Sequence, residues 1–379
     1  MEKKTKWISV IVFVMCVFFL FPQSALGQDY TVLGEEEMEK IEKALQGGME
    51  GTKIEEKISI KEIFEKLMKG DINGVLEDTG RAVVNLITSE VFLNKEFMLQ
   101  VILIAVVAAF FSNFSSSFGN ECAGETGYYV TYLLLFSIIL RSCYLLSQIT
   151  TNAISHTFTF MEVLTPAYCI AISFATGAST SAGIYEVLMV AITLCQWLML
   201  HVLIPCIHLF LVLKLLNHVT KESQFTKLAQ LMKQLIQWGL KSMIGIVVGV
   251  QVIQSLILPA YDSVKHNALE KGLQSLPGVG NGIGAITSTF VGAAVLIKNS
   301  IGVVGILAIF LVLIVPIVKV FLFSLGYRLT AAVIQPVSQK PIVECISSAW
   351  EVSDLLMQAL LSSGALFTLS IAMIAITTK

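Results

Sequence analysis

The sequence predicts an all-α, polytopic membrane protein with about six spanning helices, two Gly/Pro-rich re-entrant or broken segments, and a small helical domain outside the cytoplasm. Apolar residues make up 55% of the 379 residues, and the mean hydropathy is +0.78. After residue 97 the chain repeatedly runs about 20 residues with almost no charge, which is the length of helix that crosses about 30 Å of hydrocarbon. Residues 28–96, by contrast, hold 25 of the 52 charged side chains.

The first 27 residues have the pattern of a secretory signal peptide. Three lysines precede the apolar run 7–21, and Ala25-Leu26-Gly27 places small residues where a signal peptidase cleaves. We expect cleavage after Gly27. An uncleaved N-terminal anchor is the alternative, and in both cases residues 28 onward begin outside the cytoplasm.

Residues 28–96 form the predicted charged, helical, extracytoplasmic domain. Ser59 and Glu62 make a capping box, and Ile58 and Ile63 have the spacing of a hydrophobic staple. This pattern predicts a helix over about 59–69, with further helices at 35–46 and 72–94. Its apolar stripe fits either an internal helix contact or a surface for a partner protein.

Residues 97–379 form the predicted membrane domain. Two of its segments, 158–176 and 277–297, are apolar but rich in Gly, Ser, Thr and Pro, and we expect them to be re-entrant or broken. The spans are expected at about 97–118, 127–148, 184–213, 240–258, 300–323 and 355–376.

The membrane domain has the marks of an internal duplication, with copies at 155–265 and 266–376. Pro166 precedes Pro205 by the same interval that separates Pro277 from Pro316, although coincidence in a narrow composition is an alternative. If both Gly-rich segments re-enter, the lysine-rich stretch 214–241 and the loop 328–340 lie together in the cytoplasm, as the positive-inside rule favours. If both segments cross, the first stretch lies outside.

Charged groups and helix-breaking residues within the apolar segments are the candidate functional positions, because a buried charge is costly in a membrane. The functional interpretation places them along a polar path. The alternative is that the charged ones extend to a membrane surface. The candidate positions are Lys298, Asn299, Lys319, Glu162, Glu186, Pro166, Pro277, Pro205, Pro316, Gly280 and Gly284.

Motifs for catalysis and for cofactors are absent from the sequence. The alternating glycines after Pro277 lack the Gly-Lys-Ser/Thr of a phosphate-binding loop, and there is no HExxH or Gly-x-Ser-x-Gly. The cysteines have no metal-ligand spacing. We therefore expect no catalytic residue, cofactor or metal, and the charge balance gives no nucleic-acid footprint.

Several motifs of the membrane domain are distinctive: Leu276-Pro277-Gly278-Val279-Gly280, residues 292–302, Gln335-Pro336 and residues 341–344. With these motifs the chain resembles the stage III sporulation protein AE family, and the resemblance extends more loosely from about residue 97 to the C-terminus. It implies a protein of the mother-cell membrane around the forespore. The implied partners are the other stage III A sporulation proteins and a forespore membrane partner.

Two functions of different classes follow. The first, implied by the resemblance, is a membrane component of the mother-cell to forespore channel (feeding) complex required for endospore formation, with a homo-oligomer as one arrangement. The charged exported domain favours it. The second is a stand-alone secondary transporter or permease for a small solute, which the internal duplication favours.

Overall fold

The structure is a computed structural model that describes residues 121–176, 178–219, 225–274, 280–336, 338 and 340–377, together with eleven isolated helical positions before residue 110. The signal peptide, the exported domain at 28–96 and the span at 97–118 lie outside these ranges and stay predictions. The described ranges are helical apart from turns at Phe225 and at residues 335–336 and a bend at Ser338. Their elements are α5 Glu121–Thr176, α6 Ala178–Leu198, the π-helical turn η1 Met199–Leu203, α7 Ile204–Val219, α8 Thr226–Gln274, α9 Gly280–Ile334 and α10 Lys340–Thr377.

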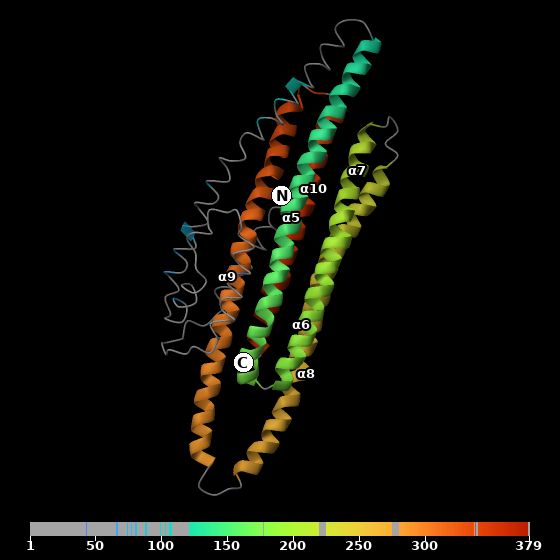
Figure 1. Ribbon diagram of the computed structural model, residues 1–379. Coiled ribbons are helices and arrows are strands. Elements are labelled where there is room, and N and C mark those ends of the chain that lie inside the picture. The colour runs from blue at the N-terminus through green and yellow to red at the C-terminus, as the bar shows by residue number, and fades with distance from the viewer. Residues whose placement is uncertain are drawn as a thin grey trace.

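The helices form an elongated bundle in which neighbours in sequence run in opposite directions (Figure 1). The continuous helix α6-η1-α7 is antiparallel to α5, and α8 is antiparallel to α6-η1-α7. Helices α9 and α10 continue this alternation. Helices α5, α8 and α10 are therefore parallel. The α7–α8 and α9–α10 connections lie at the same end of the bundle, which is the arrangement expected from the lysine-rich stretch and the loop 328–340.

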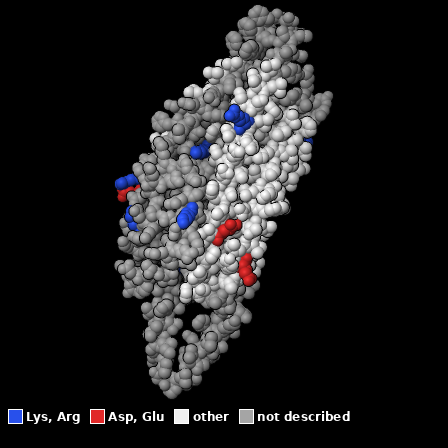
Figure 2. All heavy atoms as spheres, in the orientation of Figure 1, with Lys and Arg blue, Asp and Glu red and all other residues white. Residues whose placement is uncertain are grey.

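Five of the six predicted spans each lie on a separate helix that is long and apolar enough to cross a membrane. These helices are α5, α6-η1-α7, α8, α9 and α10. Two of them are the centre of the bundle: the spans of α9 and α10 are each 72% buried, against 28–39% for the other three. Large apolar side chains such as Val190, Trp238 and Ile246 are exposed on the outer helices. The described part of the face in Figure 2 carries few charged side chains.

The structure does not confirm two re-entrant or broken segments among the residues that are described. Segment 158–176 continues from 127–148 as the single helix α5, which contains Pro166, and residues 280–297 continue into α9, which contains Pro316. A proline removes one helical hydrogen bond, but in a membrane bundle the packing of the flanking turns maintains the helix. Helix α5 ends at Thr176 and α6 begins at Ala178, whereas α9 is continuous from Gly280 to Ile334.

Close packing between α5, α9 and α10 holds the central part of the bundle together. Phe158 and Phe367 meet edge to face with ring centroids 4.8 Å apart. A Cβ atom added at Gly305 would lie 2.6 Å from the Leu164 Cδ2 atom and 3.2 Å from the Ile371 Cδ1 atom. Small residues at such points let helix backbones approach closely, which is how helices associate in lipid.

Candidate functional site

Three helices bring opposite charges together near the end of the bundle that carries the α7–α8 connection. Lys214 of α7 donates to Glu351 Oε1 at 2.9 Å, and Lys233 of α8 donates to Glu351 Oε2 at 2.7 Å. All three side chains are less than a third exposed. One carboxylate of α10 thus links two neighbouring helices through charge-assisted hydrogen bonds.

The same face of α8 continues as a row of polar side chains that pair with α10. Gln237 Nε2 donates to Gln358 Oε1 at 3.4 Å, and Gln251 Nε2 donates to Ser370 Oγ at 2.7 Å. We call this row the α8–α10 seam. It consists of Lys233, Gln237, Gln251, Glu351, Gln358 and Ser370.

The polar pairs of the seam lie near its two ends, because the buried apolar residues Leu240 and Val247 occupy α8 between Gln237 and Gln251. Its partners are 118, 121 and 119 residues apart in sequence, so the two parallel helices keep nearly constant register. From Lys233 to Gln251 the axial distance is about 27 Å at 1.5 Å per residue, close to the hydrocarbon thickness of about 30 Å. At the far end Gln251 is 5% exposed and its Oε1 atom accepts no hydrogen bond within the described residues.

The π-helical turn η1 directly precedes α7, the helix that carries Lys214. The amide of Ile204 donates to Met199 O, the wide spacing of a π-helix. Pro205 follows at once and has no amide hydrogen, so this turn accommodates the carbonyls that an α-helix would leave without a donor. Beyond it, His208 Nε2 lies 2.6 Å from Ser147 Oγ of α5, which joins α7 to the bundle.

Lys298 is the predicted site residue with the most unusual environment, because its side chain is 0% exposed. It lies on α9 one turn before Gly302, whose added Cβ would meet Tyr168 of α5 and Ile371 of α10. Ile371 directly follows Ser370, so Lys298 lies toward the Gln251 end of the seam.

The other predicted positions are scattered over the bundle. Asn299, Lys319 and Glu162 are partly buried and Pro316 is buried, whereas Glu186, Pro166 and Pro205 are exposed. Gly280 begins α9 and Gly284 lies in its first turns. Pro277 lies outside the described residues.

Sequence reasoning missed the acceptor at the centre of the ion-pair cluster, Glu351. A usable signal was present, because Glu351, Asp354 and Gln358 place three polar groups on one face of an otherwise apolar run. Gln358 also donates to Asp354 Oδ2 at 2.9 Å. Within the described residues no cluster of three His, Cys, Asp or Glu side chains has the geometry to hold a metal ion.

The model of the stage III sporulation protein AE family matches residues 58–378. The chain belongs to this family. It is 22% identical over 310 residues to "Stage III sporulation protein AE" of Bacillus subtilis (strain 168), an alignment that covers 82% of this chain and 78% of the relative. No solved structure matches the chain.

Membership of the AE family gives this chain a role in sporulation, and its five apolar helices agree with a place in a membrane. The α8–α10 seam is a feature of this AE-family bundle that can form hydrogen bonds between two helices. Its amides, hydroxyl and charged groups can hydrogen-bond water or a polar solute between two helices, or hold those helices in register.

Proposed function

We propose that this AE-family protein is a membrane component of the mother-cell to forespore channel complex required for endospore formation. It would act in the mother-cell membrane around the forespore, with other stage III A proteins and a forespore membrane partner. The proposed role is not enzymatic. The observation that carries the proposal beyond sporulation in general is the α8–α10 seam, three interhelical polar pairs inside an apolar bundle.

The direction of the bundle in the membrane follows from its charges. Lys214, Lys233 and Arg328 lie in the halves of α7, α8 and α9 that adjoin the α7–α8 and α9–α10 connections. Basic residues collect on the cytoplasmic side, so we place this end in the mother-cell cytoplasm. Helix α10 then ends on the outer side, toward the space between the two membranes, where the exported residues 28–96 would also lie.

In this arrangement the Lys214–Glu351–Lys233 cluster stands at the cytoplasmic end of the seam. A carboxylate held by two lysines connects α10 to the pair α7 and α8, and breaking its two charge-assisted hydrogen bonds would free these helices to separate. Separation of these helices would open a path between them. The amides of Gln237, Gln251 and Gln358 would line this path. The cluster would thus control access to the seam from the cytoplasm.

The test compares Gln251→Leu and Gln358→Leu with the matched control Gln234→Leu. Gln234 is an exposed glutamine of α8. Interhelical hydrogen bonds in membranes contribute only about 0.6 kcal/mol on average, so all three variants should reach normal membrane levels. The proposal expects spore yield and late forespore gene expression to fall in the two seam variants and to stay normal in the control. Normal spore yield in both seam variants would contradict a conducting or gating role of the seam.

A stand-alone secondary transporter is the second candidate function. The buried Lys298 and the unsatisfied acceptor of Gln251 favour it, since intramembrane polar groups of this kind form solute sites in transporters. Purified protein reconstituted alone in liposomes would then take up or exchange a solute. Flux that requires companion proteins would support the complex instead.

A further inference from the structure

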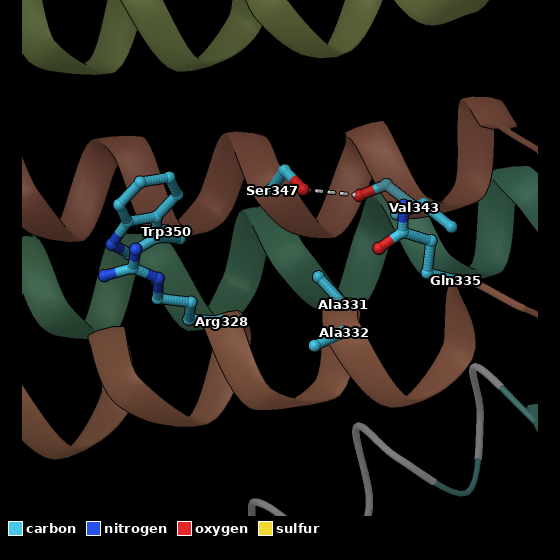
Figure 3. A pocket seen from close by; sticks show the side chains of 7 residues that line it. All are labelled: Arg328, Ala331, Ala332, Gln335, Val343, Ser347 and Trp350. Atoms are coloured by element: carbon cyan, nitrogen blue, oxygen red, sulfur yellow. Dashed lines mark hydrogen bonds between the residues drawn. The ribbon is translucent and has the colours of Figure 1, made fainter.

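A pocket of about 270 Å³ lies between α9 and α10 close to the loop that joins them (Figure 3). Side chains of both helices point into it. The volume is slightly below the roughly 300 Å³ at which pockets for whole small molecules begin, so it suits a compact polar group. The lining residues are Arg328, Ala331, Ala332, Gln335, Val343, Ser347 and Trp350.

Arg328 brings a positive charge to the rim of this pocket. Its guanidinium carbon lies 4.7 Å from the centroid of the Trp350 ring, a cation–π contact that fixes the group in place. Lys214 and Lys233 share Glu351, and Lys340 pairs with Glu344 at 3.8 Å. Arg328 is exposed and has no carboxylate partner in the part of the chain that the structure describes. Its charge is therefore available to an anion.

An apolar track leads away from Arg328 along the outer face of α9. Phe321 and Leu325 precede Arg328 by seven and three residues, which places all three on one side of the helix. Phe321 is 55% exposed and Leu325 is 41% exposed. The track runs from the pocket toward the middle of the span, as an acyl chain would below a headgroup.

The polar groups in the pocket suit a phosphodiester with a hydroxylated headgroup. The guanidinium of Arg328 presents donors to phosphate oxygens, and the amide of Gln335 is a second donor. Ser347 Oγ donates to Val343 O at 2.9 Å, so its oxygen keeps lone pairs for a hydroxyl donor of the ligand. Trp350 supplies the amphipathic ring that is common at membrane interfaces.

We propose that the Arg328–Trp350 pocket binds the headgroup of an anionic phospholipid of the cytoplasmic leaflet, with one acyl chain along Leu325 and Phe321. Basic pockets between transmembrane helices on the cytoplasmic side bind such headgroups. The same pocket chemistry would accept a free phosphate. We choose the lipid because the exposed apolar track of Phe321 and Leu325 can hold an acyl chain, which free phosphate lacks.

The test measures phospholipid retained by the full-length protein, purified in mild detergent after incubation with equal amounts of phosphatidylglycerol and phosphatidylcholine. Native mass spectrometry counts the bound lipids. The matched control is Arg141→Gln, because Arg141 is also exposed and lies at the same depth: its neighbour Ser142 hydrogen-bonds the Tyr327 hydroxyl next to Arg328. Wild type and Arg141→Gln should prefer phosphatidylglycerol equally. Arg328→Gln should lose about fivefold of that preference, corresponding to about 1 kcal/mol for one basic group.

A second variant separates loss of binding from loss of fold. Ala332→Phe fills the pocket from an exposed position and keeps Arg328, so it should lower phosphatidylglycerol retention while the melting temperature stays at the wild-type value. If Arg328→Gln melts early, Ala332→Phe alone decides the question. Equal retention by Ala332→Phe and Arg141→Gln would overturn the proposal. Displacement of phosphatidylglycerol by millimolar inorganic phosphate would also overturn it, in favour of a soluble anion.

Discussion

Lys233 and Glu351 lie 118 residues apart in sequence, yet their Nζ and Oε2 atoms are 2.7 Å apart across the α8–α10 interface. The second oxygen of the same carboxylate accepts from Lys214 at 2.9 Å. The contact joins α8 to α10, two helices that α9 separates in sequence. It also sets the register in which α8 and α10 pair along the rest of the seam.

Glu351→Gln should destabilise the bundle by about 1–3 kcal/mol, because it leaves two partly buried lysines without a counter-charge. Unfolding in detergent, followed by circular dichroism, measures the change. The control is Glu344→Gln, whose pair with Lys340 is long and solvent-exposed and should contribute less than about 1 kcal/mol. Adding Lys233→Met to Glu351→Gln should cost less than the sum of the single changes. Full additivity would refute the cluster.

Gly305→Leu should destabilise the protein by about 1–3 kcal/mol through overpacking. A side chain there meets Leu164 and Ile371, which are both buried. Gly292→Leu is the matched control on the same helix, since a Cβ at Gly292 meets nothing within 4 Å. The measurement is the midpoint of thermal unfolding in detergent. Similar midpoints for the two variants would show that α5, α9 and α10 are not closely packed at Gly305.

Lys298→Leu should lower spore yield while membrane insertion stays normal. The side chain is buried, and ionisable groups within apolar spans are costly and commonly functional. Lys241→Leu, at an exposed lysine of α8, is the control for a general loss of positive charge. A Lys298→Leu strain that sporulates normally would remove the case for a functional charge at this position.

Single cysteines at positions 227 and 340 should react with a membrane-impermeant maleimide from the cytoplasmic side, and one at position 186 from the opposite side. The background for this test has the native cysteines replaced by serine. The expectation follows from the two connections at one end of the bundle and from the positive-inside rule. Labelling of 227 and 340 from different sides would refute this topology.

The spans were predictable from the sequence because length and hydropathy are local properties. The continuity of α5 and α9 was not. Pro166 and Pro316 locally favour a break, and only the packing of their flanking turns against other helices maintains the helix through them. Tertiary contacts therefore override the local signal at both prolines.

The candidate site was predictable in part. Lys298 lies in a long apolar run, and its side chain is buried within the bundle. Glu351 was missed because its role depends on partners 137 and 118 residues away. No periodicity within α10 indicates which lysines of α7 and α8 its carboxylate will meet.

The π turn at Met199–Leu203 determines which way the following residues of that helix point. Each residue advances an α-helix by about 100°, so deletion of one residue from this turn would restore regular winding and rotate α7 by about the same angle. Lys214 would then turn away from Glu351, and His208 away from Ser147. The extra residue of the π turn thus directs the polar side chains of α7 toward their partners on α10 and α5.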